Sequence, residues 1–127
     1  MYEVKFKSEA EKAKIHMVVE NALTCVEAVR MIVDNIQDAD VLSVYLSNFK
    51  EIVRNQTTAD IDHKWYDVTA ASVCIDEISG KEKKLKYHIL IDAPDFDTAV
   101  TRTKETLSQG YDMVTFSIKE TDITDVI

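Results

Sequence analysis

The chain has 127 residues and a mass of 14.5 kDa, which suits one domain or two half-size units that share a core. Hydrophobic residues make up 46% of it, so wholesale disorder is excluded. Its 15 basic and 23 acidic residues give a net charge of −8, which disfavours non-specific binding to nucleic acid. No apolar run reaches the ~18 residues of a membrane span, and the N-terminal residues do not resemble a signal peptide. We therefore expect a soluble, cytoplasmic protein without membrane contact.

The first half begins with a predicted hairpin of two strands. Tyr2, Val4 and Phe6 alternate with charged residues, which is the pattern of a half-buried strand. The charged segment 8–14 turns the chain, and 15–19 is the return strand. This pattern predicts that the apolar face of the hairpin contributes to a core.

A helix and a third strand complete the first half. Thr24 precedes an apolar-periodic run and Glu27 follows three residues later, which is typical of a capping box. In the third strand Leu42, Val44 and Leu46 face one way, with Ser43, Tyr45 and Ser47 on the other side. The predicted core face of the helix is a broad stripe made of Val26, Ala28, Val29, Ile32, Val33 and Ile36.

The second half repeats this order of elements. Strands are predicted over 66–78 and 83–91, and Ser79-Gly80 forms the turn between them because Gly80 tolerates a positive φ. Asp95 is the predicted N-cap of a helix, and Gly110 stands where a left-handed C-terminal cap belongs. The predicted core residues of this helix are Phe96, Ala99, Val100, Thr103 and Leu107. In the third strand Val114, Phe116 and Ile118 alternate with Thr115, Ser117 and Lys119.

The two halves match one another along the chain. The register offset grows from 64 at the first strand to 74 at the last, mainly because the second hairpin is longer. Five segments correspond in the same order: 2–5 with 66–69, 16–20 with 88–92, 24–29 with 95–100, 42–44 with 114–116 and 50–53 with 124–127. The sequence therefore predicts an internal duplication.

The duplication predicts an α+β fold of tandem β-β-α-β units. A right-handed crossover puts the first strand of each unit in the middle, in the order 2-1-3, with the helix on the apolar face of an antiparallel sheet. We expect a single domain over 1–127, built of repeats 2–53 and 66–127 with a connector over 54–65. A unit of about 55 residues is marginal alone, so the repeats are expected to share a core and to be related by a pseudo-two-fold axis.

Several short motifs resemble a known but uncharacterised family. They are Trp65-Tyr66 at the start of a strand, DEISGKEKK at 76–84, IDA at 91–93, AV at 99–100 and TDV at 124–126, with NALT at 21–24 and EA at 27–28 in the first half. The chain resembles, over nearly its whole length, the domain-of-unknown-function family 4494. The first half departs from the pattern, since its hairpin is shorter and lacks the glycine turn. The resemblance implies an origin in gut Bacteroidetes and their phages or mobile elements, and it implies no known activity.

The two cysteines and the acidic residues give weak signals for chemistry. Cys25 falls in the predicted first turn of a helix and Cys74 in a strand, and we interpret both as small core residues of a reduced protein. Asp92, Asp95 and Asp97 could gather around a divalent cation, but Asp95 has a capping role and no calcium-loop pattern is present. We expect neither a metal ion nor another cofactor.

The three histidines are the next candidates. His16 and His88 occupy equivalent strand positions, where they could meet as ligands or as a pH-sensitive contact, although such residues more often lie on a half-buried strand face. His63 lies in the connector with Asp60 and Asp62, where hydration is the simpler interpretation.

A lysine-rich hairpin is the only basic run. Lys81, Lys83, Lys84 and Lys86 lie beside Tyr87, an arrangement that could contact phosphates. Lysines also protect edge hairpins from aggregation, and the acidic chain favours that interpretation.

Three functions remain open, of which a non-catalytic protein-interaction module is favoured. No nucleophile elbow, phosphate loop or dinucleotide fingerprint is present, so we expect no enzymatic activity. The alternatives are a phage or mobile-element accessory factor acting on nucleic acid or its binding proteins, and a small-ligand or nucleotide-binding protein with a cleft between the halves. A protein partner or a second copy would bind the helix-free sheet face or an exposed edge. The residues expected at this surface are Tyr45, Lys83, Lys84, Tyr87, Thr115, Ser117 and Lys119.

Overall fold

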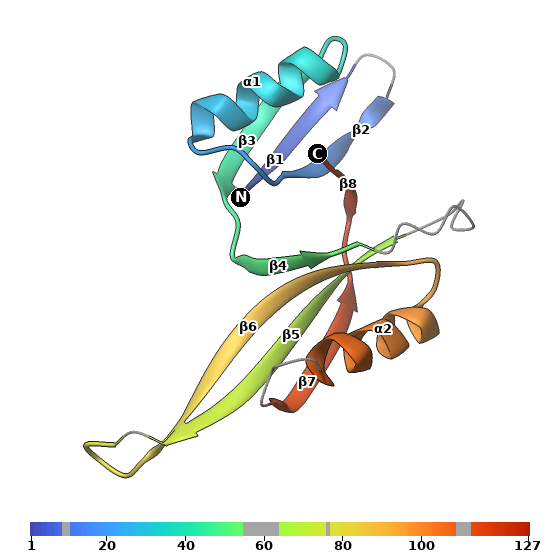
Figure 1. The fold of residues 1–127 in the computed structure, drawn as a ribbon. Coiled ribbons are helices and arrows are strands. Elements are labelled where there is room, and N and C mark those ends of the chain that lie inside the picture. Colours follow the sequence, from blue (N-terminus) through green and yellow to red (C-terminus); the bar gives the residue numbers. More distant parts are fainter. Residues whose placement is uncertain (9–10, 55–63, 76, 109–112) are drawn as a thin grey trace. The chain divides into compact units, whose positions relative to one another are not determined.

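The computed structural model describes residues 1–8, 11–54, 64–75, 77–108 and 113–127 (Figure 1). Within these ranges the fold is mixed α+β, with two helices and two four-stranded sheets. The chain divides into two compact units, each with one sheet and one helix. Unit 1 comprises Met1–Asn48 and Asp122–Ile127, and unit 2 comprises Phe49–Thr121. The single domain with boundaries at 53 and 66 stays a prediction.

Unit 1 contains the sheet β3-β1-β2-β8 and helix α1. Strand β1 pairs antiparallel with both β2 and β3, so the first strand lies in the middle, as the sequence predicts. Strand β8 pairs parallel with β2. The elements are β1 (Tyr2–Ser8), β2 (Glu11–Val19), α1 (Cys25–Asn35), β3 (Asp40–Leu46) and β8 (Ile123–Val126).

Unit 2 contains the sheet β4-β6-β5-β7 and helix α2. Strand β5 lies in the middle and pairs antiparallel with β6 and β7, which again agrees with the predicted order. Strand β4 pairs parallel with β6. The elements are β4 (Phe49–Val53), β5 (Lys64–Ile75), β6 (Glu82–Ala93), α2 (Phe96–Ser108) and β7 (Met113–Glu120).

The fourth strand of each sheet comes from the other half of the chain. Strand β4 follows β3 in sequence but belongs to the sheet of unit 2, and β8 follows β7 but belongs to the sheet of unit 1. The sequence pattern matched these two segments to each other but did not predict them as strands, and the predicted antiparallel sheet is wrong for these two pairings. Short parallel edge strands leave little local signal, because their partners are distant in sequence.

The core of unit 1 lies between its sheet and α1. Val4 and Phe6 of β1 and Met17 of β2 are buried against Ala28 and Ile32 of the helix. The alternation of β1 thus predicts its buried face correctly. Tyr2, Ile15, Val44 and Ile127 pack around the edge of this core.

Helix α1 begins at the predicted N-cap. The predicted core face of this helix is wrong in part. The Glu27 N–H donates to Thr24 Oγ1 at 3.1 Å, and the Glu27 carboxylate accepts from the Leu23 N–H, one residue before the position of an ideal capping box. Val26 and Val33 are exposed, because α1 turns Ala28 and Ile32 toward the sheet, where its main contacts are with β1 and β3. Cys25 is exposed as well, so its interpretation as a core residue is wrong.

The core of unit 2 is formed by the apolar face of β5 and β6 under α2. Val68, Ile89 and Ile91 are fully buried with Leu107 of the helix, and Tyr66 and Ala93 pack on Ala99. Phe96 is more than half exposed and meets the ring of Tyr66 edge to face, so its place in the predicted core face is wrong.

The predicted N-cap of α2 and the predicted glycine turn of unit 2 are confirmed. The Thr98 N–H donates to Asp95 Oδ1 at 2.7 Å, which is the N-cap of α2. Gly80 adopts a φ of 67° in the turn between β5 and β6. The predicted C-cap at Gly110 lies outside the described residues.

Deleting residues 122–127 is expected to destabilise unit 1 selectively. It removes the bonds from Glu20 N–H to Ile127 O and from Ile127 N–H to Val18 O, both 2.9 Å, and it removes buried Ile123 and Val126. Loss of these two side chains from the core costs about 3–5 kcal/mol. Hydrogen–deuterium exchange should speed up in β1 and β2 relative to β5 and β6. Equal acceleration in both sheets would contradict the assignment of β8 to unit 1.

Candidate functional site

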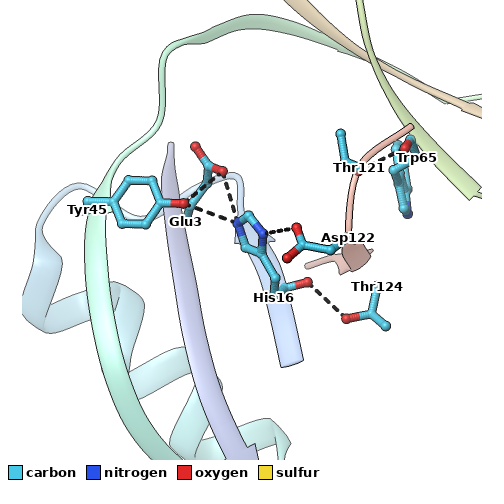
Figure 2. Close-up of polar contacts among 7 residues, drawn as sticks. All are labelled: Glu3, His16, Tyr45, Trp65, Thr121, Asp122 and Thr124. Atoms are coloured by element: carbon cyan, nitrogen blue, oxygen red, sulfur yellow. Dashed lines mark hydrogen bonds and ion pairs between the residues drawn. The ribbon is translucent and has the colours of Figure 1, made fainter. Parts of the chain in front are cut away.

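A cluster of four titratable side chains lies in unit 1 (Figure 2). Glu3, His16 and Tyr45 come from β1, β2 and β3, and Asp122 immediately precedes β8. Each of the four strands of this sheet therefore contributes one member, directly or through the residue at its start.

Strand register brings these residues to one face of the sheet. His16 lies opposite Lys5, and Glu3 is two residues from Lys5 on the same face of β1. Tyr45 lies directly opposite Glu3 on the other side of β1. His16 also lies opposite Ile123 in the parallel pair with β8, which places the preceding Asp122 beside the imidazole.

The imidazole of His16 is held between two carboxylates. Nε2–H donates to Glu3 Oε1 at 2.9 Å, and Nδ1–H donates to Asp122 Oδ1 at 2.7 Å. The hydroxyl of Tyr45 donates to the same Glu3 oxygen at 3.3 Å. Glu3 and His16 are only 7% and 8% exposed, so their ion pair is poorly screened by water. Two ionised acceptors require both ring nitrogens to carry protons, which makes His16 an imidazolium.

The charges of the cluster stabilise one another. Burial by itself would lower the pKa of His16, but the hydrogen bonds and charges of Glu3 and Asp122 outweigh it and the pKa is raised. Burial likewise tends to raise the pKa of Glu3, but the hydrogen bond and charge of His16, with hydrogen bonds from Ser47 and Tyr45, lower it. The hydrogen bond from His16 lowers the pKa of Asp122.

Tyr45 completes the cluster as a neutral donor. Burial and then the negative charge of Glu3 raise the pKa of its phenol to about 12. The ammonium of Lys5 lies 5.9 Å from the centre of the Tyr45 ring, and its charge also lowers the pKa of Asp122. The group consists of two carboxylates, an imidazolium and a nearby lysine, so opposite charges balance locally.

The residues around Asp122 are fixed on both sides of it. The Thr124 hydroxyl donates to the His16 carbonyl at 2.9 Å within unit 1. In unit 2 the Thr121 N–H and hydroxyl both donate to the Trp65 carbonyl, at 3.0 and 2.8 Å (Figure 2). Asp122 is thus the first residue of unit 1 after the chain leaves unit 2.

Unit 2 holds a second histidine in the equivalent position. His88 Nδ1 lies 3.1 Å from Asp67 Oδ1 and 3.4 Å from the Thr69 hydroxyl, and Phe49 of β4 meets its ring edge to face. His88 lies opposite Thr69 and Phe49 in the sheet, as His16 lies opposite Lys5 and Ile123 in unit 1. In both units the histidine thus contacts the acidic residue two positions before its partner on the central strand.

This arrangement favours a structural role for His16. An imidazolium that donates through both nitrogens has no lone pair with which to accept a proton from a substrate. Its carboxylate partners are engaged in the same bonds. The sequence singled out His16 but not Glu3 or Asp122, because the partners lie 13 and 106 positions away along the chain.

The predicted interaction residues are divided between the two units. Tyr45 is partly exposed at the His16 cluster, whereas Ser117 and Lys119 are exposed on β7 of unit 2. Lys83 is exposed on β6. Tyr87 is half-buried, and the Lys50 ammonium lies over its ring, 4.1 Å from the ring centre. The side chains of Lys84 and Thr115 lie outside the described residues. Whether these positions bind a partner stays a prediction.

Two of the three acidic residues predicted as a metal site, Asp92 and Asp95, are engaged in other contacts. Asp95 caps α2, and Asp92 faces the Arg102 guanidinium at 3.7 Å, while its carbonyl accepts from Arg102 at 2.6 Å. Among the described residues, no group of three or more His, Cys, Asp and Glu side chains is arranged to hold a metal ion. The predicted candidates Asp60, Asp62 and His63 lie outside the described ranges.

Comparison with known proteins identifies the family. A family model described as "Domain of unknown function (DUF4494)" matches residues 1–127. The chain belongs to this family. The resemblance expected from the sequence motifs is thereby confirmed, while an origin in gut Bacteroidetes and their phages stays a prediction. No curated protein and no solved structure matches the DUF4494 chain. In the described part of the chain, neither helix has the length and apolar character needed to cross a membrane.

The stability of this DUF4494 protein is expected to peak between about pH 4.5 and 6.5. Because the pKa of His16 is raised, its contribution is complete below 6.5 and is lost as pH rises through the raised value. Because the pKa values of Glu3 and Asp122 are lowered, their contributions are complete above 4.5 and 3.8 and are lost as pH falls further. Urea unfolding followed by circular dichroism across this range measures the profile.

His16→Gln is the variant that tests the cause of this profile. The substitution should lower the free energy of unfolding by about 2–3 kcal/mol near pH 6, since it leaves Glu3 buried without its cation. It should also flatten the decline in stability toward about pH 8. His88→Gln is the matched control, because it leaves the His16 cluster intact and should retain the decline. An unchanged profile in His16→Gln would show that another group causes it.

Proposed function

We propose that this protein is a non-catalytic protein-binding module of the bacterial cytoplasm, and that it binds an extended segment of a protein along β3. The observation that carries the proposal is the exposure of apolar side chains on this edge strand. Leu46 is 69% exposed and Leu42 46%, and Tyr45 is also exposed. Strand β3 pairs with β1 on one side only, because it is the outer strand of the sheet of unit 1.

Edge strands of this kind are suited to strand addition. An extended peptide pairs with the free backbone groups of the edge, and the side chains that flank the edge provide specificity. Natural proteins usually protect such edges with charged residues or proline. Between Val41 and Leu46 strand β3 has neither, which favours a binding role for it.

The His16 cluster supports a binding role rather than a catalytic one. It lies on β1, β2 and β3 and stiffens the sheet whose edge is exposed. Tyr45 belongs both to this cluster and to the exposed edge strand. A rigid edge lowers the conformational entropy lost when a partner strand binds.

We also propose that the chain arose by tandem duplication. Both sheets have the same order of corresponding strands, β3-β1-β2-β8 and β7-β5-β6-β4. The equivalent positions of His16 and His88 support the same origin. A pseudo-two-fold relation between the copies stays a prediction.

Photo-crosslinking in cells that produce the protein tests the binding role. Benzoylphenylalanine at position 42 should form a defined adduct with a protein that mass spectrometry then identifies. The matched control carries the same group at position 75, since Ile75 is 71% exposed at the end of β5 in unit 2. Adducts at position 42 that are absent, or no more abundant than those at position 75, would contradict binding along β3.

A second candidate function is contact with nucleic acid through the β5–β6 hairpin. It is favoured by the Lys50 ammonium 4.1 Å from the Tyr87 ring, which adds a lysine from β4 beside those of the hairpin. Lysines flanking an aromatic ring can bind phosphates next to a stacked base.

A gel-shift titration with single- and double-stranded DNA at low salt tests this candidate. The double variant Lys83→Glu and Lys84→Glu should weaken any binding by about tenfold or more, and added salt should weaken it further. Lys104→Glu together with Lys119→Glu is a control with the same change of charge at other positions. No shift of the unmodified protein at low salt would reject the candidate.

A further inference from the structure

Among the four edge strands in the described ranges, β3 has the least charged sequence. Strand β4 contains Lys50 and Glu51, β7 ends in Lys119 and Glu120, and β8 contains Asp125 within only four residues. In β3 the only charged residue is Asp40, at its first position. The protection that charge gives to the other three edges is therefore missing at this one.

The backbone of β3 presents pairing groups outward. The Ser47 N–H donates to the Met1 carbonyl at 3.0 Å, so the odd-numbered residues at this end of β3 bond toward β1. Since bonding alternates along a strand, the N–H and C=O groups of Val44 and Leu46 point away from the sheet. These groups can form an antiparallel ladder with another strand.

An exposed apolar patch continues from this edge onto α1. We define it by its four residues, which are 51–84% exposed: Leu23, Val26, Val33 and Leu46. Leu46 lies opposite Tyr2 in the sheet, and the Tyr2 hydroxyl donates to the Leu23 carbonyl at 3.4 Å, so strand and helix start are neighbours here. Val26 and Val33 lie on one flank of α1, and a right-handed crossover from β2 to β3 turns that flank toward β3.

We propose that the segment bound at β3 is β3 of a second copy of this chain, so that the two sheets of unit 1 join across an antiparallel β3–β3 seam. This inference rests on the proposed function, whose occupant it names. Strand β3 is complementary to itself, since a two-fold axis pairs its uncharged, mainly apolar residues with the same uncharged residues of the second copy. In a chain of net charge −8, this is an edge at which two copies meet without bringing like charges together.

The position of α1 fits the same arrangement. The helix contacts β3 and β1, so its axis lies above them, about 5 Å from a seam whose strands are about 4.8 Å apart. Two helices related by the seam would then lie about 10 Å apart, which is a normal packing distance. Their facing flanks would bury Val26 and Val33 of both copies, which are exposed in the single chain.

Sedimentation equilibrium of the intact chain over a dilution series, under reducing conditions because Cys25 is exposed, tests the proposal. We expect a species of twice 14.5 kDa that dissociates on dilution. Leu46→Lys and Val33→Lys should each raise the dissociation constant about a hundredfold or more, because each buries two unpaired charges at the seam. Ile75→Lys, at a residue of similar exposure outside the patch, should leave it unchanged.

The outcomes separate this inference from the proposed function. Circular dichroism confirms that each variant is folded, and Val33→Lys changes a helix surface position that the fold does not bury. A monomer at all concentrations, or a dimer that both patch variants leave intact, would overturn the β3–β3 seam. If the monomeric chain still crosslinks from position 42 to a different protein, the binding role of β3 stands and only its occupant is wrong. If it crosslinks to nothing, both proposals fail.

Discussion

The parallel pairing of β8 with β2 is the interaction on which unit 1 depends. The last residues of the chain, Ile123–Val126, complete a sheet whose other strands all lie within the first 46 residues. Strand β4 plays the same part beside β6 in unit 2. Each sheet therefore takes its fourth strand from the other half of the chain. A β-β-α-β unit of this size alone buries too little surface for robust stability.

The His16 cluster holds β2, the strand with which β8 pairs. Burying an imidazole and a carboxylate costs free energy, and the cost is offset here because opposite charges and hydrogen bonds meet within 3 Å. The cluster joins β1, β2 and β3 to Asp122, the residue immediately before β8. In unit 2 the contact of His88 with Asp67 repeats the pair, but Phe49 stands at its edge and supplies an aromatic contact.

The exposed surface of unit 1 follows from the same construction. Strand β8 covers one edge of the sheet with a charged, four-residue strand, and β3 is left as the other edge. Helix α1 sits over β1 and β3, and it turns Ala28 and Ile32 inward and Val26 and Val33 outward. One helix cannot cover four strands. The apolar patch on α1 and the exposed edge strand β3 are therefore adjacent.

Local patterns in the sequence determined the presence of both strand hairpins, both helix starts, the Gly80 turn and the order with the first strand in the middle. They did so because alternation, capping side chains and turn residues act over a few positions, as at Thr24, Asp95 and Gly80. They did not determine the start of β2, which begins at Glu11 and not at residue 15. Only the tertiary structure decided the exchange of β4 and β8, the exposure of Val26 and the burial of Glu3. Those outcomes depend on contacts such as His16 with Asp122, 106 positions apart, whose free energy no short stretch of sequence contains.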